Sequence, residues 1–490
     1  MNDYAEAATT AVELLADHVA EARDGLGPAT VRPDPDALAA DLELERWIHQ
    51  GGMDAAAFAD WLPRYLDATV RLHHPGSMAH QVAVPSTGAA VADLVHGATN
   101  NPMAIYEMGA AGATIEREVV RWMLDKVGFD RESGAGVLTH GGSLANLTAL
   151  LAARARVAPD AWRTGVPADL ALLAPASAHY SVPRAAAILG LGEEAVIELE
   201  VDELERIRPD RLPAALERCA AAGRRPLALV APACATSTGL YDDLRAIGGF
   251  CAEHGIWLHV DAAHGASALL SERHRGLLDG IELGDSVVWD AHKLLRTSGL
   301  CAAVLVRHGP DLPSAFRQSG AYLFNGQESV GFDLLDRALE TTKTTLGLKL
   351  FLSLAWEGER GLGEYVASRF DTARRFHELL SREPDVTCPY VPESNILCFR
   401  IGDGDQLALR ERVLAGGRLH IGSTTVNGER HLRLVVTAPD TDEETLRDLL
   451  SALRQSLGRG PRAPARRSRP RACGTSGPSR SQSSGTRHRP

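Results

Sequence analysis

The chain contains short apolar runs that each stop at polar or charged residues. One reads Trp-Leu-His-Val-Asp and ends at Asp261, and a second reads Ser-Val-Val-Trp-Asp-Ala-His-Lys and ends at Lys293. A third, Ala-Ala-Val-Leu-Val, stops at Arg307. Runs of this length and composition are typical of parallel strands that are buried on both faces of a sheet. Because α/β sheets bind ligands at the carboxyl ends of such strands, the pattern predicts a site at which Asp261 and Lys293 meet.

Lysine is rare in this sequence, which makes its positions informative. Of the 51 basic residues only four are lysine, namely Lys126, Lys293, Lys343 and Lys349. An arginine guanidinium neither loses its proton nor forms an imine, so a retained lysine often does what arginine cannot. Amphipathic patterns over 116–127 and 334–354 predict solvated helix positions for three of the four. Lys293 alone follows a strand end, although a surface lysine after a strand remains the alternative interpretation.

Asp261 and Lys293 together indicate a particular cofactor chemistry. A lysine can form an imine with a carbonyl cofactor, and a carboxylate can hold a pyridine nitrogen in its protonated form. These are the two groups that pyridoxal phosphate (PLP) requires from a protein. The pair therefore predicts a PLP site at the carboxyl edge of the sheet.

Two other strand ends supply groups that suit such a cofactor. A glycine-rich turn, Thr-His-Gly-Gly-Ser, ends at Ser143 and leads into a helical pattern over 143–157. A helix that begins this way offers free backbone N–H groups to a phosphate, although the same residues are often only a cap. His179 follows an apolar run over 170–174 and either takes part in the site or bonds only to the backbone. Further strand patterns alternate with helical ones from 137 to 306, which predicts a mostly parallel α/β sheet.

Composition restricts the class of protein. The chain has 490 residues, of which 45% are hydrophobic and 23% charged, as is ordinary for a soluble globular protein. We find no apolar run of membrane-spanning length and no signal-peptide pattern at the N-terminus, and we expect no membrane partner. The seven cysteines form no CxxC pair, which favours reduced thiols in a cytoplasmic protein. His254, His259 and His264 lack partners at metal-ligand spacing, so no metal site is predicted.

The sequence divides into four parts. Residues 1–70 carry helical patterns before any strand and are expected to form an N-terminal helical arm. Residues 71–357 are expected to form the large cofactor-binding domain, and residues 358–457 a small C-terminal domain of helices and strands. Residues 458–490 are rich in Arg, Pro and Ser, which predicts disorder. The formal charge of −12 includes this basic tail, so the rest is strongly acidic and a nucleic-acid partner is not expected.

With these residues in place, the chain resembles the group II PLP-dependent amino acid decarboxylases, which include the glutamate, aromatic amino acid and diaminobutyrate enzymes. The resemblance covers about residues 70–455. Its motifs are Val-Asp-Ala-Ala at 260–263, Asp-Ala-His-Lys at 290–293, His-Tyr-Ser at 179–181, Gly-Ser-Leu-Ala at 142–145 and the segment 86–107. It implies an α/β protein of PLP fold type I, like aspartate aminotransferase, with a small C-terminal α+β domain. It also implies a homodimer that acts on an amino acid.

The resemblance implies a role for each residue around the cofactor. Lys293 would bind PLP covalently, Asp261 would hold its pyridine nitrogen protonated, and His179 would stack on its ring. The remaining cofactor contacts would be Gly142 and Ser143 at the phosphate, Thr236 near the ring hydroxyl, and His292 beside the lysine. Asp290 occupies a position that is Asn in some relatives, where it helps to hold the phosphate.

The same resemblance implies residues that act on the substrate. Tyr322 corresponds to a loop tyrosine that returns a proton to the substrate carbon, and Arg433 to an arginine that meets the substrate carboxylate in glutamate-type members. His264 stands where relatives commonly have an aromatic residue, and Leu144 replaces an acidic or polar residue of the phosphate turn. Gln81, His264 and Arg433 together favour a substrate with a polar or acidic side chain.

Decarboxylation of an L-amino acid to its amine is the expected reaction. Transamination, aldol-type cleavage and decarboxylation-dependent oxidative deamination would use the same Lys293 and Asp261, so they remain alternatives. A non-catalytic PLP-fold partner protein is a third interpretation, which the presence of Lys293 and Tyr322 opposes.

Overall fold

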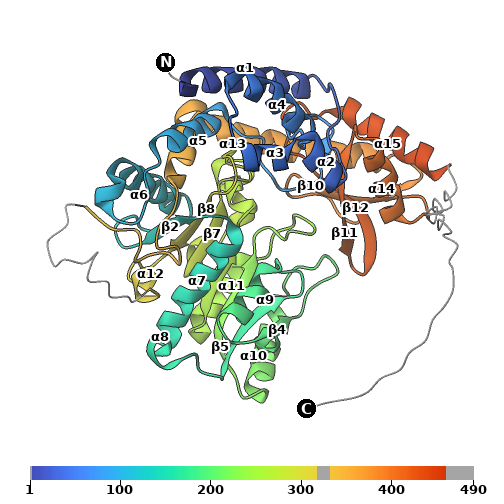
Figure 1. The fold of residues 1–490 in the computed structure, drawn as a ribbon. Coiled ribbons are helices and arrows are strands. Elements are labelled where there is room, and N and C mark those ends of the chain that lie inside the picture. The colour runs from blue at the N-terminus through green and yellow to red at the C-terminus, as the bar shows by residue number, and fades with distance from the viewer. Residues whose placement is uncertain (1–2, 317–330, 459–490) are drawn as a thin grey trace, which may run out of the picture.

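The computed structural model describes residues 3–316 and 331–458 (Figure 1). The predicted proton donor Tyr322 and the Arg-rich tail from 459 onward lie outside the described residues. Within the described part, the strands form a seven-stranded sheet and a separate five-stranded sheet.

The large sheet has the order β2-β8-β7-β6-β5-β3-β4. Its strands are β2 (Ala135–Thr139), β3 (Leu170–Pro175), β4 (Val196–Leu199), β5 (Arg225–Pro232), β6 (Trp257–Asp261), β7 (Ser286–Asp290) and β8 (Ala302–Val306). Neighbours pair in parallel except at β8, which is antiparallel to both β2 and β7. The predicted mostly parallel sheet is therefore confirmed, but the run before Arg307 is not a parallel strand. The connection between β7 and β8 is too short for the crossover that a parallel pair needs.

Helices cover both faces of this sheet and make it a three-layered α/β structure (Figure 1). They are α5 (Thr87–Thr99), α6 (Ala110–Lys126), α7 (Gly142–Val157), α8 (Ala161–Thr164), α9 (Ser181–Ile188), α10 (Leu212–Ala221), α11 (Leu244–His254), α12 (Asp311–Ser314) and α13 (Leu346–Leu380). Alternate strand residues face opposite layers: Leu170 and Leu172 pack with α7 and α9, whereas Ala171 and Leu173 join the core that contains α6, α10 and α11. This alternation explains why the strands are apolar throughout.

A smaller sheet of order β1-β11-β12-β10-β9 lies C-terminal to the large one. Its elements are β1 (Ser77–Met78), β9 (Val386–Thr387), β10 (Ile396–Ile401), β11 (His420–Val426) and β12 (Glu429–Val435), with α14 (Gln406–Ala415) and α15 (Glu443–Leu457). Its core includes Phe376 and Leu380 from the end of α13. The expected C-terminal α+β unit is thus present. The sequence patterns did not reveal that β1, from a segment that reads as loop, pairs with β11.

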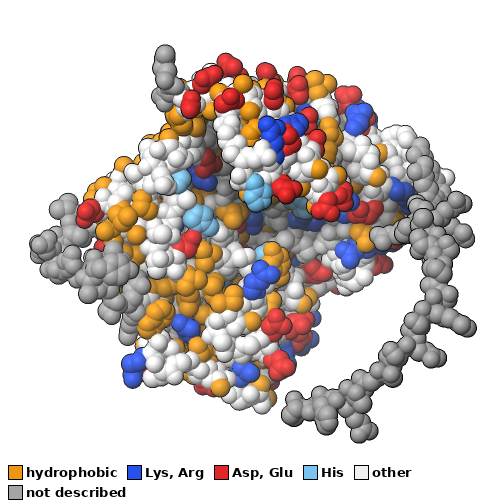
Figure 2. Space-filling view, viewed as in Figure 1, with side chains coloured by type: hydrophobic (Ala, Val, Ile, Leu, Met, Phe, Trp, Pro, Cys, Tyr) orange, Lys and Arg blue, Asp and Glu red, His pale blue; other side chains and the backbone are white. Residues whose placement is uncertain are grey.

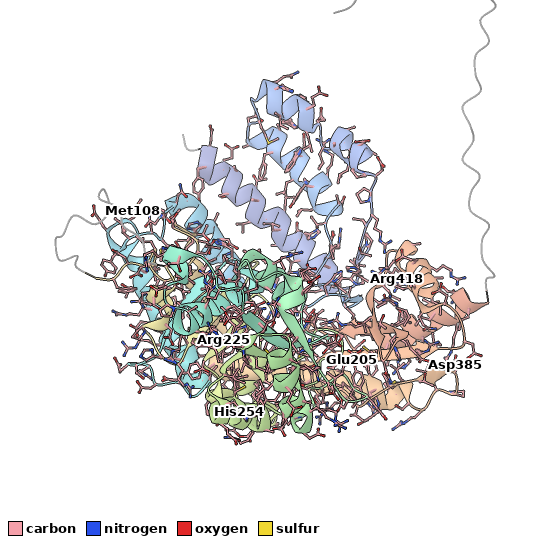
Figure 3. All side chains as sticks on the ribbon, turned by 90° about the horizontal axis from the view of Figure 1, so that it is seen from below. Met108, Glu205, Arg225, His254, Asp385 and Arg418 are labelled. Atoms are coloured by element: carbon pink, nitrogen blue, oxygen red, sulfur yellow. The ribbon has the colours of Figure 1, made fainter. Side chains whose placement is uncertain are left out.

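The N-terminal helices stand out from the rest of the molecule (Figure 3). They are α1 (Asp3–Arg23), α2 (Pro35–Asp41), α3 (Leu44–Gln50) and α4 (Ala55–Asp67). Their only buried side chains are Ala22 in α1 and Leu62 and Leu66 in α4. The four helices therefore have apolar surface that the described part of the chain does not cover.

Two of the lysines are buried, contrary to the sequence-based expectation. The predicted helix over 334–354 begins only at Leu346, and Lys343 precedes it. The Lys343 ammonium forms an ion pair with Glu116, and both side chains are 1% exposed. Lys349 is likewise buried and lies 2.8 Å from a carboxylate oxygen of Asp93. A periodic pattern identifies a helix face, but it cannot show that a carboxylate far away in the sequence will neutralise a buried lysine.

Substitution of Lys343 by Met should strongly destabilise the fold, since it leaves the Glu116 carboxylate buried without its counter-charge. We expect a loss of about 3 to 5 kcal/mol in the free energy of unfolding, measured by urea denaturation. The matched control is Lys126→Met, because Lys126 pairs with Glu359 in a more exposed setting. That change should alter the free energy by less than about 1 kcal/mol. Equal stability of the two variants would contradict a structural role for the buried pair.

Candidate active site

A pocket of about 300 Å³ opens at the carboxyl edge of the large sheet. Residues that follow β2, β3, β5, β6 and β7 line it. The predicted site residues among them are Gly142, Ser143, His179, Thr236, Asp261, His264, Asp290, His292 and Lys293. Gln81 and Arg433 do not line this pocket, and Tyr322 lies outside the described residues. Figure 2 shows the face of the molecule hollowed at its centre, with histidine side chains around the hollow.

Lys293 and Asp290 form the charged end of the pocket. The Lys293 ammonium lies 3.2 Å from Asp290 Oδ2, and the Asp290 side chain is only 2% exposed. His292 lies beside them, with Nε2 at 3.8 Å from the same oxygen and Nδ1 at 2.8 Å from the carbonyl oxygen of Cys301. The second oxygen of Asp290, Oδ1, has no hydrogen-bond partner among the described residues. Among the described residues, Lys293 therefore lies closest to this buried carboxylate, with His292 as a second, more distant partner.

Asp261 is held by donors that keep its carboxylate in place. Oδ2 accepts a hydrogen bond from Asn146 Nδ2 at 2.9 Å, and Oδ1 accepts one from the backbone N–H of Ala263 at 3.3 Å. The residue is 8% exposed, so little water competes for these bonds. The two donors therefore fix the position of the carboxylate in the pocket wall.

A chain of buried polar side chains continues behind Asn146. Its Oδ1 lies 3.0 Å from His259 Nε2, and His259 Nδ1 lies 2.8 Å from Ser286 Oγ. Trp257 Nε1 donates to the same hydroxyl at 2.9 Å. Burial lowers the pKa of His259 to about 4, so the ring is neutral and can donate from Nε2 while accepting at Nδ1. Asn146 Nδ2 donates both to Asp261 and to Ser181 Oγ at 2.9 Å, so the chain connects Asp261 with the segment that follows β3.

Asn146 was not predicted from the sequence, although one signal could have revealed it. It lies one helical turn after Gly142, and residues four apart share a helix face. It is also a fully buried amide in an otherwise apolar helical segment. A buried amide in such a segment requires polar partners, and Asp261 is one of them.

The N-terminus of α7 lines the pocket and turns backbone N–H groups toward its start. Gly141 adopts φ 99°, a conformation that favours glycine, and no described side chain caps the helix. The first N–H groups of α7 thus remain available to a phosphate. Gly142 must also be small, because a Cβ there would lie 2.7 Å from Asp290 Oδ2. This combination of a lysine, a buried carboxylate and a free helix N-terminus fits PLP.

His179 and Thr236 also line the pocket. His179 Nδ1 is 2.8 Å from Ser181 Oγ, and its ring packs against Tyr180 with centroids 4.1 Å apart. Burial lowers the pKa of His179, and this effect is larger than the opposite effect of the nearby Asp261 carboxylate. The ring is therefore neutral near pH 7 and can stack without carrying a charge. The sequence left open whether His179 takes part in the site or bonds only to the backbone. Because His179 lines the pocket, the structure favours the first interpretation.

Arg433 belongs to a neighbouring groove of about 660 Å³, which shares His179 and Thr236 with the pocket. Its guanidinium donates to the carbonyl oxygens of Thr236 at 2.7 Å, Ser237 at 3.2 Å and Ala79 at 3.3 Å. The guanidinium has five N–H donors, and only those that do not bond to these carbonyl groups are left for a substrate. Gln81 lies near Ala79 in the sequence, and its Nε2 has no hydrogen-bond partner in the described part of the chain.

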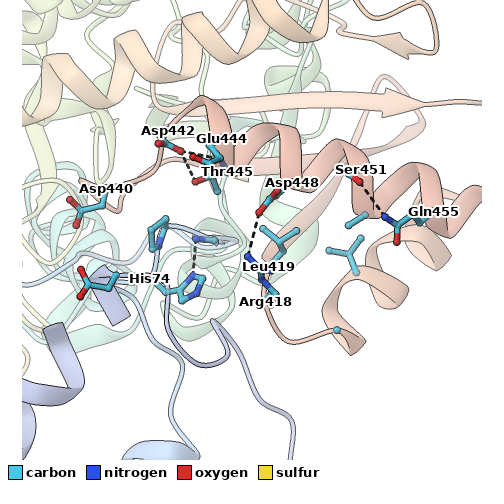
Figure 4. Close-up of a pocket in the computed structure, with 17 residues that line it drawn as sticks. His74, Arg418, Leu419, Asp440, Asp442, Glu444, Thr445, Asp448, Ser451 and Gln455 are labelled. Carbon is cyan, nitrogen blue, oxygen red and sulfur yellow. Dashed lines mark hydrogen bonds and ion pairs between the residues drawn. The ribbon is translucent and has the colours of Figure 1, made fainter. Parts of the chain in front are cut away.

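A second cavity, of about 570 Å³, lies between the turn at His74 and helix α15 (Figure 4). Its lining includes the carboxylates of Asp440, Asp442, Glu444 and Asp448 but no lysine. It therefore lacks the group that binds a carbonyl cofactor. In the described ranges, no group of three His, Cys, Asp or Glu residues is placed to hold a metal ion. No helix there has the length and apolarity to cross a membrane.

The large sheet is seven-stranded and mostly parallel. Its carboxyl edge carries a lysine, a buried carboxylate and a helix N-terminus that can bind a phosphate. Together these features define the fold type I class of PLP enzymes. The model of the pyridoxal-dependent decarboxylase conserved domain matches residues 62–402. The chain therefore belongs to the pyridoxal-dependent decarboxylase family. This confirms the predicted fold class, the cofactor PLP and the expected reaction, the decarboxylation of an amino acid.

Individual relatives agree with this assignment. The chain is 30% identical over 413 residues to L-2,4-diaminobutyrate decarboxylase of Rhizobium meliloti, with 81% of each protein covered. It is 31% identical over 371 residues to cysteine sulfinic acid decarboxylase of Homo sapiens, which covers 75% of this chain and 74% of that protein. The crystal structure of mouse CSAD is similar with a TM-score of 0.82 and 28% identity, over 91% of this chain and 99% of that one.

Replacement of Asp290 by Asn should tighten PLP binding. The change removes a negative charge that lies 3.2 Å from the Lys293 ammonium and close to the start of α7. The cofactor phosphate is an anion, so the removal of a nearby negative charge favours its binding. We expect the apparent Kd for PLP to fall by about three- to tenfold, measured by absorbance titration of the apoenzyme. Asp279→Asn, in an exposed pair with Arg245, is the control, and a rise in Kd for Asp290→Asn would contradict this account.

Proposed function

We propose that Lys293 binds PLP covalently and that Asp261 holds its ring nitrogen protonated during decarboxylation of an L-amino acid. The single observation that supports this proposal is that Lys293, Asp261 and the free N-terminus of α7 line one pocket. When bound, PLP supplies a protonated ring that accepts the electron pair left behind as carbon dioxide departs. The remaining tasks, which are binding, orientation and proton transfer, fall to the side chains of this chain.

Each remaining residue has a proposed task that matches its position. Gly142 and Ser143 bind the phosphate through their N–H groups, while Asp290 and His292 orient the Lys293 amine. His179 packs on the cofactor ring, and Thr236 bonds near its hydroxyl. The bond to the carboxyl group must stand perpendicular to the ring plane, so a rigid pocket contributes by holding the substrate in that orientation.

The proton that replaces the lost carboxyl group needs a donor. We propose Tyr322 for this task, on the basis of the resemblance of its segment to the family. A phenol near the substrate carbon can supply the proton and then recover it from water.

The substrate is proposed to carry a polar side chain. The relatives include enzymes named for 2,4-diaminobutyrate, which has an amino group, and for cysteine sulfinic acid, which has an acidic group. His264 lines the pocket and Arg433 lines the neighbouring groove, so both provide polar groups close to the site. Gln81 keeps its proposed role from the resemblance to the family alone. Arg433 would meet a substrate carboxylate through the N–H groups that its three carbonyl partners leave free.

The protein is proposed to act as a homodimer. Val91, Leu94 and Val95 are exposed on α5, and the N-terminal helices expose further apolar residues, among them Leu15 and Ile48. Figure 2 shows apolar side chains gathered where α5 and α6 lie. Contiguous apolar surface of this kind marks an interface. The described cysteines are all free thiols, which supports a reducing compartment such as the cytoplasm.

Reduction of the holoenzyme with borohydride, followed by peptide mapping, should place the pyridoxyl group on Lys293. Lys293 lines the pocket, whereas Lys126, Lys343 and Lys349 do not and pair with carboxylates elsewhere in the fold. Lys293→Ala should release no carbon dioxide above background from the common amino acids, whereas Lys126→Ala should behave as the wild type. A pyridoxyl group on another lysine would refute the assignment of the site.

Asp261→Asn tests the role of the buried carboxylate. The amide keeps the size of the side chain and can still accept from Asn146, but it cannot stabilise a protonated ring nitrogen by charge. We expect kcat to fall by about 100- to 1,000-fold or more, because this interaction matters most as the electron pair is released. Folding should be little changed, as judged by thermal unfolding. Carbon dioxide release at the wild-type rate would show that Asp261 does not serve the cofactor.

A further inference from the structure

Glu205 adopts a backbone conformation that is unusual for glutamate. Its φ is 64°, in the left-handed region that residues with a side chain seldom occupy. Asparagine and aspartate enter this region more readily, because their short side chains can bond to the nearby backbone. The turn around Glu205 is fixed by Asp202, whose Oδ1 accepts the N–H groups of Leu204 at 2.8 Å and Arg206 at 2.9 Å. A costly conformation of this kind persists where contacts with the surrounding structure impose it.

The Glu205 carboxylate links two segments that are far apart in the sequence. Oε2 accepts a hydrogen bond from Ser237 Oγ at 3.2 Å, and Oε1 accepts one from the backbone N–H of Asn427 at 3.2 Å. Ser237 follows β5 of the large sheet, whereas Asn427 lies at the tip of the hairpin that joins β11 to β12. Asn427 and Gly428 both have positive φ, as in the type I′ turn of a two-residue hairpin, which leaves the Asn427 N–H without a strand partner. Figure 3 shows Glu205 where the large α/β part meets the C-terminal unit.

The two segments joined by this link also position Arg433. Arg433 lies on β12, and its guanidinium donates to the carbonyl oxygens of Thr236 at 2.7 Å and Ser237 at 3.2 Å. Glu205, Ser237, Asn427 and Arg433 line one groove, which shares Thr236 with the cofactor pocket. The position of the hairpin relative to Thr236 therefore determines where the Arg433 guanidinium stands beside that pocket.

The backbone of Glu205 makes a third contact at the same groove. Its carbonyl oxygen accepts a hydrogen bond from Ser177 Oγ at 3.1 Å. Ser177 lies close in sequence to His179, and both line the groove. The three partners of Glu205, which are Ser177, Ser237 and Asn427, are neutral donors, so hydrogen bonds and not ion pairs make these links.

We propose that Glu205 is a positioning residue for the substrate. Its carboxylate holds the β11–β12 hairpin against the segment that follows β5, and thereby fixes Arg433 and the groove beside the cofactor pocket. Glu205 acts through Arg433 and has no direct part in the reaction. This inference rests on the proposed function, in which Arg433 meets a carboxylate of the substrate. A loosened hairpin weakens substrate binding and leaves the chemical step of the bound substrate nearly unchanged.

Replacement of Glu205 by Gly separates this role from a role in folding. Glycine adopts positive φ without cost, so the backbone is relieved while both contacts of the carboxylate are lost. We expect the Tm to stay within about 3 °C of the wild type. The substrate is L-2,4-diaminobutyrate or L-cysteine sulfinate, whichever the wild-type holoenzyme decarboxylates faster. KM should rise by about 5- to 20-fold while kcat changes by less than about twofold. Hydrogen exchange of peptides over 420–435 should become faster.

Two further variants identify the cause. Glu205→Gln should keep KM within about threefold of the wild type, because its amide can accept from the Asn427 N–H and donate to Ser237 Oγ. Glu43→Gly is the matched control, since Glu43 also has a positive φ, of 50°, and pairs with two arginines of the N-terminal helices. It should leave KM and the exchange of 420–435 unchanged.

Other results would overturn the proposal. Unchanged exchange of 420–435 in Glu205→Gly would show that the carboxylate does not hold the hairpin. Faster exchange with an unchanged KM would show that the link does not serve the substrate. An equal rise in KM in Glu205→Gln would mean that the charge of the carboxylate acts and not its hydrogen bonds. A rise in the apparent Kd for PLP would assign Glu205 to the cofactor site.

Amino acid binding, followed through cofactor absorbance, keeps this test separate from the test of the proposed activity. An enzyme that binds the two amino acids without releasing carbon dioxide would contradict decarboxylation. Weaker binding of both by Glu205→Gly would then still support the role of Glu205, and equal binding by the wild type and the variant would refute it.

Discussion

The arrangement of the pocket depends on a buried carboxylate, Asp261, whose oxygens are largely shielded from water. A carboxylate in such a place is stable only if donors surround it, and Asn146 and the Ala263 N–H are those donors. Asn146 is oriented by His259, which is oriented by Ser286. The polar chain thus joins α7, β6 and β7. The helix that offers its N-terminus to the phosphate is thereby tied to the strands that carry Asp261 and Asp290.

The second constraint is the return of the chain after Lys293. The short connection from β7 makes β8 antiparallel, so the segment 291–301 turns back across the carboxyl edge of the sheet. That turn brings the backbone of Cys301 to His292 and places Leu300 in the pocket lining. The apolar pattern of β8 predicted a parallel strand. Because β8 is antiparallel, the segment that contains Lys293 turns back at the site.

The pocket combines groups of opposite hydrogen-bonding character. The start of α7 and Lys293 present donors, whereas Asp261 and Asp290 present carboxylate oxygens. The large sheet carries the proposed cofactor residues. The C-terminal unit contacts the pocket lining through Asn395, which lies 2.7 Å from His264.

The sequence by itself determined the strand ends and the residues they deliver. Asp261 and Lys293 could be predicted because apolar runs of strand length stop at them, and strand ends of a parallel sheet share one edge. Asn146, Asn395 and the buried pair of Glu116 and Lys343 were decided only by the tertiary structure. Their partners are far away in the sequence, and no local periodicity records which polar groups will meet. A hydrogen bond or buried ion pair needs an approach within a few ångström, and only the packing of separate elements provides it.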